Sequence, residues 1–346
     1  MKQPLKIWLP SIRAGSGSDV FMLRLAEGLR RAGHEVVSQW FDRKYELMPW
    51  RLESVPAPPD TDLVHAGSWQ GFAFKRVGVP LIVTEHQYIS NPDFAPYRNI
   101  PQMLYHHLFV ERWVRRSYAA ADAIVAVSEY CATAMRSDLR KPVTVIHNWV
   151  DTASFSPRKN TPESVPRAQP FKLLFVGNPS RWKGADLLPV IAERLGQGFE
   201  LNCLGGLRRG FHKIRVRDNM RLLEPRQPDR MPELYRAMDA VLIPTRYESF
   251  GYVALEAMAC GLPVVGFDSS GTAEVCQHGK TALLAPVEDV ERLAGYIRQL
   301  AAAPSLCAEL GAAGRHRAVE HFNEADAVSA YLDVYTTILS DAVYPR

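Results

Sequence analysis

Two glutamates, Glu248 and Glu256, flank the predicted start of a helix in the stretch RYESFGYVALEAMACGLPVV. The helix is predicted to begin near Gly251 and to end at Cys260, where a glycine follows. The first turn of a helix leaves backbone N–H groups unpaired and carries a partial positive charge, so it favours an anion such as phosphate. A glycine at that point lets a ligand approach the backbone closely.

Each glutamate can accept hydrogen bonds from hydroxyl groups near that anion site. Glu248 lies in the loop with Ser249 and Phe250, and we expect Glu256 on a different side of the helix from its packing residues. One carboxylate can accept from two vicinal hydroxyls. The spacing favours a ligand with hydroxyls, then phosphate, then hydroxyls, which is the layout of a nucleotide sugar. The alternative is a helix-capping acid followed by an exposed helix glutamate, and spacing alone does not decide between the two.

Two further loops follow predicted strands and precede predicted helices. In VGNPSRWKGADLL, Arg181 and Lys183 bring two cations near a helix start, enough to hold a diphosphate; the alternative is a solvated basic turn. In PSIRAGSGSDVF, the run of Gly15, Ser16 and Gly17 allows close approach of a ligand; the alternative is a tight strand–helix turn. The first loop lacks the order of a Walker loop, and the second lacks the third glycine of a dinucleotide fingerprint.

A histidine follows another predicted strand. In IVTEHQY, Glu85 and His86 stand at the carboxyl end of the strand. A histidine at such a rim can hydrogen-bond a substrate hydroxyl or a phosphate. A lone histidine is more often structural, so His86 is a candidate only together with the other loops.

Short apolar runs alternate with helical patterns, which predicts α/β domains with mostly parallel sheets and helices on both faces. The pattern stops in the proline-rich stretch DTASFSPRKNTPESVPRAQP and then restarts. We expect an N-terminal domain over 1–158, a linker over 159–167 and a C-terminal domain over 168–325. A last helix within 326–346 packs back on the first domain or stays on the second. Ligands in such sheets bind beyond the carboxyl ends of the strands, which is where the four loops lie.

The composition is that of a globular protein and argues against several functions. The 346 residues include 41 basic and 37 acidic side chains, and a net charge of +4 is too small to indicate a nucleic-acid partner. The five cysteines are scattered without a Cys-x-x-Cys pair, so we expect reduced thiols and no metal site. We see no signal peptide and no apolar span of membrane length, so we expect a cytoplasmic protein.

The stretch PTRYESFGYVALEAMACGLPVVGFDSSGTAEVCQHGKTALL resembles the C-terminal signature of glycosyltransferase family 4. That signature has a Glu, seven residues, a second Glu, a small-residue helix, Gly-x-Pro-Val and a Gly-x-x-Glu turn. The matching residues here are Glu248, Glu256, Gly261, Pro263 and Gly271 to Glu274. The resemblance implies the GT-B fold, in which two doubly wound Rossmann-like domains face each other across a central cleft. It also implies a retaining, metal-independent enzyme with no cofactor.

The resemblance implies roles for residues of the donor loop. Glu248 would contact hydroxyls of the donor sugar, and Glu256 would bind the ribose. Ser249, Phe250 and Gly251 would offer backbone amides to the sugar and the phosphates.

The resemblance also implies roles in the other loops. Lys183, with Arg181 beside it, would neutralise the leaving diphosphate. His86 would meet the sugar near its reacting carbon. The loop of Gly15 and Gly17 would shape the floor under the phosphates.

Two positions depart from the family pattern. The family often has Arg immediately after the glycine of its basic loop, where this chain has Asn178, which leaves Arg181 as the nearest substitute. In the usual Asn-Gly-Val-Asp, Trp149 replaces the glycine.

The acceptor is less clear from the sequence. Residues 97–118 mix aromatic, aliphatic and basic side chains, and the residues that we single out there are Leu108, Arg112, Trp113, Arg115 and Arg116. Such a segment can lie on an anionic membrane surface, where family members use lipid-linked acceptors. An ordinary amphipathic helix is the alternative, which we favour slightly.

The resemblance therefore predicts transfer of a hexose-type sugar from a UDP- or GDP-linked donor to a hydroxyl of a glycan or lipid-linked acceptor. The setting would be assembly of bacterial cell-surface polysaccharide or glycolipid. A sugar phosphorylase or a sugar-nucleotide epimerase on the same fold is one alternative. A non-catalytic nucleotide-sugar binder is another.

Overall fold

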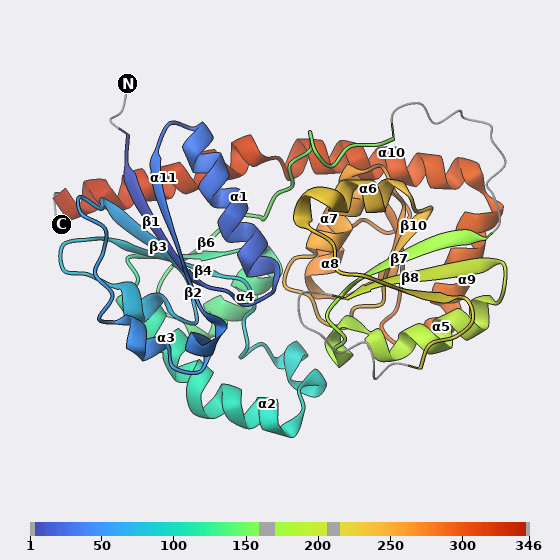
Figure 1. Ribbon diagram of the computed structural model, residues 1–346, viewed down its shortest axis with the longest axis horizontal. Helices are drawn as coiled ribbons and strands as arrows, with labels where there is room; N and C mark the ends of the chain where they lie inside the picture. Colours follow the sequence, from blue (N-terminus) through green and yellow to red (C-terminus); the bar gives the residue numbers. More distant parts are fainter. Residues whose placement is uncertain (1–3, 159–169, 206–214, 344–346) are drawn as a thin grey trace. The chain divides into compact units, whose positions relative to one another are not determined.

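The computed structural model describes residues 4–158, 170–205 and 215–343, and the chain forms two compact units. Unit 1 comprises Met1–Asn148 together with Glu324–Arg346, and unit 2 comprises Trp149–Asn323. Each unit is built on one sheet of six parallel strands (Figure 1). The expected linker 159–167 lies outside the described residues.

The sheet of unit 1 has the strand order β2-β1-β3-β4-β5-β6. The order reverses between β1 and β3, so the sheet is doubly wound. Its strands are β1 (Lys6–Ile12), β2 (Glu35–Phe41), β3 (Leu63–Gly67), β4 (Leu81–Glu85), β5 (Ala123–Ala126) and β6 (Val143–Val145).

Helices cover both faces of this sheet, with α1 and α11 on one side and α3 on the other (Figure 1). Helix α1 buries Phe21, Leu25 and Leu29, which recur every four residues and therefore share one face. The helices of unit 1 are α1 (Gly17–Arg31), α2 (Ile100–Tyr105), α3 (Glu111–Ala120), α4 (Glu129–Asp138) and α11 (Glu324–Val343). Shorter turns are η1 (Arg43–Glu46), η2 (Pro49–Leu52), η3 (Gly71–Phe74), η4 (Pro92–Tyr97) and the π-helical η5 (His106–Val110).

The segment 97–118 is not one continuous amphipathic helix. It runs through the end of η4, α2, the π-helical turn η5 and most of α3. Trp113 is buried, and Arg116 pairs with Glu53 at 2.9 Å and lies over the ring of Phe72. Trp113 therefore lies in the core of unit 1 rather than on a surface where it could meet a membrane.

The last helix, α11, is anchored in unit 1 by buried polar contacts. The Tyr335 hydroxyl lies 2.6 Å from Nδ1 of His65, and Nε2 of His65 lies 2.7 Å from the Thr84 hydroxyl. Helix α11 also crosses α1 closely, since a Cβ at Gly28 would lie 2.5 Å from a methyl of Val328. The sheet, α1 and α11 thus share one packed face.

The sheet of unit 2 has the order β12-β11-β10-β7-β8-β9, and its switch point lies between β7 and β10. Its strands are β7 (Phe171–Gly177), β8 (Phe199–Gly205), β9 (Met220–Leu223), β10 (Ala240–Ile243), β11 (Val264–Phe267) and β12 (Ala282–Ala285). Its helices are α5 (Leu188–Leu195), α6 (Met231–Arg236), α7 (Tyr252–Ala259), α8 (Ser270–Val275), α9 (Val290–Ala302) and α10 (Pro304–His321), and its short turns include η6 (Arg181–Lys183), η7 (Ala185–Leu187) and η9 (Pro228–Arg230).

Helices α5 and α9 share one core with the sheet of unit 2, and α10 packs against α7. The contact with α10 is close, because a Cβ at Gly311 would lie 2.2 Å from the carbonyl oxygen of Gly261. Helix α7 is buried around its whole circumference from Ala254 to Ala259. The alternative of an exposed helix glutamate is therefore wrong: α7 is covered on all sides and buries Glu256 as well.

Candidate functional site

The loop after β10 carries Glu248 and leads directly into α7. Gly251 caps the helix with φ 110°, a backbone conformation that side chains rarely adopt, which explains the glycine. The backbone N–H of Glu248 donates to the Ser270 hydroxyl at 2.8 Å, and the carbonyl of Glu248 accepts from the N–H of Gly271 at 2.9 Å. The first residues of α8 therefore hold the loop in place.

Lys183 forms an ion pair with Glu248. Lys183 ends η6, in the basic loop after β7, and reaches a carboxylate 65 positions later in the chain. Both side chains are only partly exposed, at 26% and 19%. The sequence predicts a ligand-binding role for each residue, but the local spacing did not reveal that they pair with each other.

A small cavity lies at the switch point of unit 2. It has a volume of about 10 Å³, room for roughly one water molecule. Its lining residues come from β7, the basic loop, β10 and the first turn of α7: Phe175, Val176, Lys183, Leu242, Ile243, Thr245, Glu248, Gly251, Val253 and Ala254. Three predicted site residues, Lys183, Glu248 and Gly251, thus meet where nucleotides bind in open α/β sheets.

The other donor-loop residues are buried in unit 2. Glu256 is 9% exposed and accepts a hydrogen bond from the Tyr235 hydroxyl at 2.9 Å. Ser249 and Phe250 are also buried, and the ring of Phe250 meets that of Phe322 edge to face at 5.7 Å. A ligand at this loop would therefore meet the backbone of Ser249 and Phe250 rather than their side chains.

Arg181 lies apart from this group. It is exposed and is not one of the residues that line the small cavity. Its carbonyl oxygen accepts a hydrogen bond from Arg246, a residue that the sequence patterns did not single out. The structure therefore places Lys183, but not the Arg181 side chain, beside Glu248.

In unit 1, His86 follows β4 and packs against Phe21 of α1, with ring centroids 4.5 Å apart. Burial lowers the pKa of His86 to about 3, so the ring is neutral at pH 7. Its Nε2 atom is shielded from solvent and has no hydrogen-bond partner among the described residues. A neutral imidazole with an unsatisfied nitrogen can donate to or accept from an uncharged hydroxyl.

The residue before it, Glu85, shapes the turn that carries His86. Its carboxylate accepts from the N–H of Gln87 at 2.8 Å and from the hydroxyl of Tyr118 in α3. Burial raises the pKa of Glu85, while these hydrogen bonds oppose the shift. Glu85 therefore ties the end of β4 to α3.

The glycine loop at the start of α1 is closed by an acid. The Asp19 carboxylate accepts from the N–H groups of Ala14 and Gly15 at 3.1 and 2.9 Å. Gly15 has φ 64°, and Ser16 caps the helix that begins at Gly17. The conformation is the predicted tight turn. The Asp19 carboxylate occupies the start of α1, a position that would otherwise favour a phosphate.

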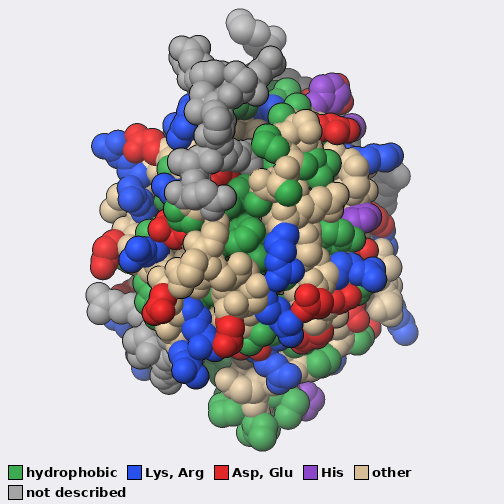
Figure 2. Space-filling view, turned by 90° about the vertical axis from the view of Figure 1, so that its right-hand side faces the viewer, with side chains coloured by type: hydrophobic (Ala, Val, Ile, Leu, Met, Phe, Trp, Pro, Cys, Tyr) green, Lys and Arg blue, Asp and Glu red, His purple; other side chains and the backbone are tan. Residues whose placement is uncertain are grey.

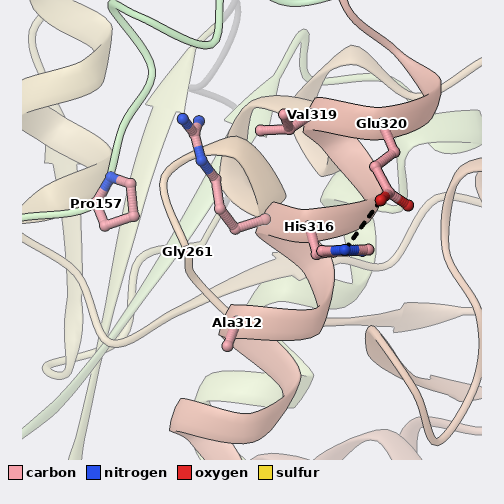
Figure 3. Close-up of a pocket in the computed structure, with 7 residues that line it drawn as sticks. Pro157, Gly261, Ala312, His316, Val319 and Glu320 are labelled. Carbon is pink, nitrogen blue, oxygen red and sulfur yellow. Dashed lines mark ion pairs between the residues drawn. The ribbon is translucent and has the colours of Figure 1, made fainter.

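A larger hollow lies elsewhere on unit 2, mainly along α10 (Figure 3). Its volume is about 590 Å³, and its lining is mostly apolar with the His316–Glu320 pair at 3.0 Å at one side. Its lining residues are Pro157, Gly261, Ala312, Arg315, His316, Val319 and Glu320. None of the predicted site residues lines it, so size alone does not mark the site here.

Within residues 4–158, 170–205 and 215–343, no three His, Cys, Asp or Glu side chains gather in a way that could hold a metal ion. None of the helices within those ranges is long and apolar enough to cross a membrane.

Comparison with solved structures identifies the fold. Sucrose-phosphate synthase from Thermosynechococcus elongatus matches with a TM-score of 0.81 and 20% identity, covering 97% of this chain and 99% of that one. HepE of Anabaena, solved with UDP-glucose, matches with a TM-score of 0.76 and 18% identity over 96% of this chain and 100% of its own. The two doubly wound sheets with their helices have the GT-B fold.

Comparison of sequences identifies the family. The model described as Glycosyl transferases group 1 matches residues 157–317, and the one described as Glycosyltransferase Family 4 matches residues 43–154. A D-inositol 3-phosphate glycosyltransferase of Xylanimonas cellulosilytica is 31% identical over 79% of this chain and 71% of its own length. Alpha-maltose-1-phosphate synthase of Mycolicibacterium smegmatis is 29% identical over 80% of this chain and 79% of its own. The chain belongs to glycosyltransferase family 4.

Proposed function

We propose that this glycosyltransferase moves a hexose-type sugar from a nucleoside-diphosphate sugar to a hydroxyl group of a glycan or lipid-linked acceptor. The transfer retains the anomeric configuration and needs no metal ion. The observation that carries the proposal is the Lys183–Glu248 pair beside the first turn of α7, at the switch point of unit 2.

The charge arrangement suits a diphosphate next to a sugar. An ammonium group has three N–H donors, so Lys183 can hold Glu248 and a phosphate oxygen at once. The start of α7 at Gly251 adds backbone N–H groups and a partial positive charge. Glu248 has acceptor capacity beyond Lys183, which suits the hydroxyls of a sugar.

The reaction follows from this arrangement. The bond between the anomeric carbon and the diphosphate oxygen breaks, and the oxygen takes the electron pair. Lys183 and the start of α7 stabilise the negative charge that develops there. The acceptor hydroxyl attacks from the side of the leaving group, and its proton passes to the diphosphate. The neutral His86 would hydrogen-bond a sugar hydroxyl through its unsatisfied Nε2.

The donor base is tested directly by ligand-induced stabilisation. UDP is the first candidate, since HepE was solved with UDP-glucose, and GDP is the second. A nucleoside diphosphate at one hundred times its dissociation constant should stabilise the protein by about 2.7 kcal/mol. Glu256→Ala should abolish that stabilisation, whereas Glu309→Ala, on the exposed face of α10, should not. ADP and NAD serve as negative ligands.

Turnover distinguishes the transferase from the alternatives. Anomeric proton NMR of the product should show the same configuration as the donor, and EDTA should leave the rate unchanged. Cleavage that requires inorganic phosphate would indicate a phosphorylase. Sugar-nucleotide interconversion without an acceptor would indicate an epimerase. Binding of the donor without any turnover would leave a non-catalytic binder.

The proposed acceptor side is a surface of unit 1 with exposed apolar side chains. Ile100, Met103 and Leu104 of α2 and Leu108 and Phe109 of η5 are all more than 40% exposed. Hydrophobic side chains gather at the lower edge of the molecule in Figure 2, the height at which α2 lies in Figure 1. Side chains of this kind insert into the headgroup region of a bilayer.

We therefore propose a lipid-linked acceptor met at the inner face of an anionic membrane, in assembly of cell-surface polysaccharide or glycolipid. Flotation with phosphatidylglycerol vesicles at low salt tests this. The double variant Leu108→Ser/Phe109→Ser should lose binding, whereas Val190→Ser, an exposed apolar position in α5 of unit 2, should keep it. Wild-type protein that stays in the unbound fraction would exclude the membrane, without touching the donor assignment.

A further inference from the structure

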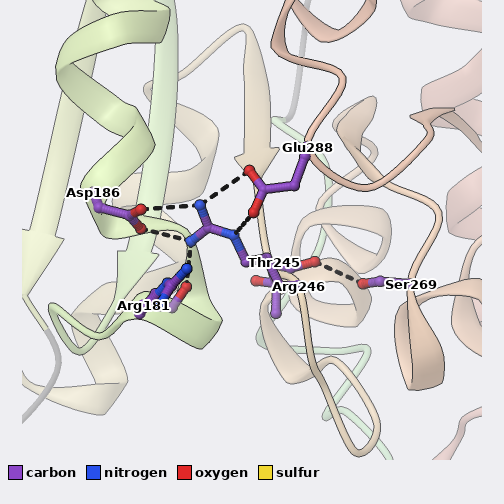
Figure 4. Close-up of polar contacts among 6 residues, drawn as sticks. All are labelled: Arg181, Asp186, Thr245, Arg246, Ser269 and Glu288. Carbon is purple, nitrogen blue, oxygen red and sulfur yellow. Dashed lines mark hydrogen bonds and ion pairs between the residues drawn. The ribbon is translucent and has the colours of Figure 1, made fainter. Parts of the chain in front are cut away.

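Arg246 lies two positions before Glu248 and is almost fully buried. Its side chain is only 3% exposed, and it comes from the loop that follows β10. Figure 4 shows its guanidinium lying between Asp186, Glu288 and the backbone of Arg181. Arg246 is therefore a buried arginine close to the candidate site.

Each of the five N–H groups of the guanidinium has an acceptor. Asp186 accepts from both terminal nitrogens at 2.6 and 2.9 Å. Glu288 accepts from Nε at 2.5 Å and from one terminal nitrogen at 3.1 Å. The carbonyl oxygen of Arg181 accepts the remaining N–H at 2.5 Å. The planar guanidinium thus ties three separate segments together, which a point-charge ammonium could not do.

The backbone makes the same connection. The N–H of Arg246 donates to the carbonyl of Trp182 at 2.8 Å, and that of Tyr247 donates to the same carbonyl at 3.3 Å. Trp182 is the residue before Lys183, and Tyr247 is the residue before Glu248. The two loops that present the Lys183–Glu248 pair are therefore joined by backbone hydrogen bonds and by the side-chain hydrogen bonds of the Arg246 guanidinium. We call these side-chain contacts, to Asp186, Glu288 and the Arg181 carbonyl, the Arg246 fork.

Stability alone is a weak explanation for this fork. Burying an arginine is costly, and a buried ion pair is often no more stabilising than apolar residues of the same volume. The two carboxylates are about half exposed, at 48% and 51%, so the cost falls mainly on Arg246. What the fork adds is a fixed position for the segments it joins.

We propose that Arg246 is a positioning residue that holds the Lys183 loop against the Glu248 loop, so that the ammonium meets the developing charge of the leaving diphosphate. This inference deepens the proposed function and rests on its assignment of Lys183. Because Lys183 would act on charge that develops in the transition state, loosening the fork affects kcat more than KM.

The experiment compares Arg246→Met and Arg246→Lys with Arg194→Met, a control that removes an exposed arginine paired with Glu291 in the same unit. Misplacement of a group by about 1 Å can cost about 100-fold in rate, so we expect kcat to fall by roughly 10- to 100-fold in both Arg246 variants. KM for the nucleotide sugar should change by much less, and Arg194→Met should match wild type. Hydrogen exchange should become faster in segments 180–187 and 245–251 of the Arg246 variants.

Several results would overturn the proposal. One is a folded Arg246→Met protein with wild-type kcat, even if it unfolds at a lower temperature, because that is a purely structural role. Another is unchanged hydrogen exchange in the two segments. If Arg246→Met does not fold, Asp186→Asn/Glu288→Gln, which removes both carboxylate charges and keeps the arginine, is judged by the same two readouts.

The outcome for the proposed function is separate. Wild-type protein that turns over no nucleotide sugar would contradict that function. Faster exchange in the two segments of Arg246→Met would still support the fork as the element that holds them.

Discussion

The two units differ in whether the polar side chains in and after their strands are charged or neutral. In unit 2 oppositely charged side chains pair: Lys183 with Glu248, and Arg246 with its two carboxylates. In unit 1 two histidines, His86 after β4 and His65 inside β3, are held neutral, because burial lowers their pKa values to about 3. Burial also raises the pKa of Glu85.

Under the proposed function this difference suits the two regions to different chemistry. A partly shielded edge with paired charges is suited to a diphosphate, whose charge would grow as the bond to the sugar breaks. A neutral, desolvated edge is suited to hydroxyl groups, which hydrogen-bond without a change of charge. The comparison therefore predicts that charge substitutions act mainly through unit 2, and that loss of buried neutral hydrogen bonds or a change of pH acts mainly through unit 1.

Removing the cation should have the largest effect. Lys183→Met takes away the charge that we propose to lie next to the leaving group, and we expect kcat to fall by about 10²- to 10³-fold. Steady-state rates with the best nucleotide-sugar donor measure this. Lys172→Met, at an exposed lysine of β7, is the matched control and should match wild type. Equal activity of the two variants would mean that the charged edge is not where the chemistry occurs.

The second largest effect is expected from adding a methyl group at Gly184, in the basic loop after β7. Gly184 has φ 71°, and a Cβ there would lie 1.9 Å from the carbonyl oxygen of Pro244. Gly279 has φ 72° but no heavy atom within 4 Å of such a Cβ, so it shares the positive φ without the clash. Gly184→Ala should therefore cost about 1–3 kcal/mol more unfolding free energy than Gly279→Ala. Urea unfolding measures both, and equal losses would show that the loop can shift freely.

Acid should weaken unit 1 through His65. Its pKa is lowered by burial first and by His86 second, so the folded state binds the proton only near pH 3, whereas the unfolded chain binds it near pH 6.5. Stability is therefore complete above about pH 6.5 and falls on acidification by up to about 1.4 kcal/mol per pH unit. His65→Gln should show a shallower pH dependence of unfolding free energy than wild type. Parallel curves would mean that His65 titrates at the same pH in the folded and unfolded chain.

The smallest effect should come from one buried hydroxyl. Tyr335→Phe removes the partner of His65 Nδ1 at 2.6 Å and should lower the unfolding free energy by about 1 kcal/mol. Tyr45→Phe, at a partly buried tyrosine of the same unit, should have little effect. A Tyr335→Phe protein as stable as wild type would indicate that the hydrogen bond to α11 is replaced by another partner.

Local patterns were enough to predict most of the fold. Short apolar runs alternating with helical patterns predicted mostly parallel sheets, and the glycine at 251 correctly marked the start of α7, which begins at Tyr252. The family resemblance gave the GT-B fold, which the solved structures confirm. The four residues of β12, ALLA, are too few for periodicity to separate strand from helix.

The hydrogen-bond and ion-pair partners of the site residues could not be predicted from local sequence patterns. Arg246 meets Asp186 and Glu288, which are 60 and 42 positions away, and no local spacing rule connects them. Burial of Glu256 depends on helices that cover α7 from all sides, which a single helical period does not show. The roles of all the candidate site residues stay predictions, because they depend on a bound donor.

The place of α11 in unit 1 has a consequence for synthesis of the chain. Unit 1 is made of two stretches of sequence with all of unit 2, Trp149–Asn323, between them. A ribosome therefore completes unit 2 before it makes the helix that covers Phe21 and His65. The nascent chain must keep an apolar face of its first sheet uncovered throughout that interval, so the domain that is started first is the one that is finished last.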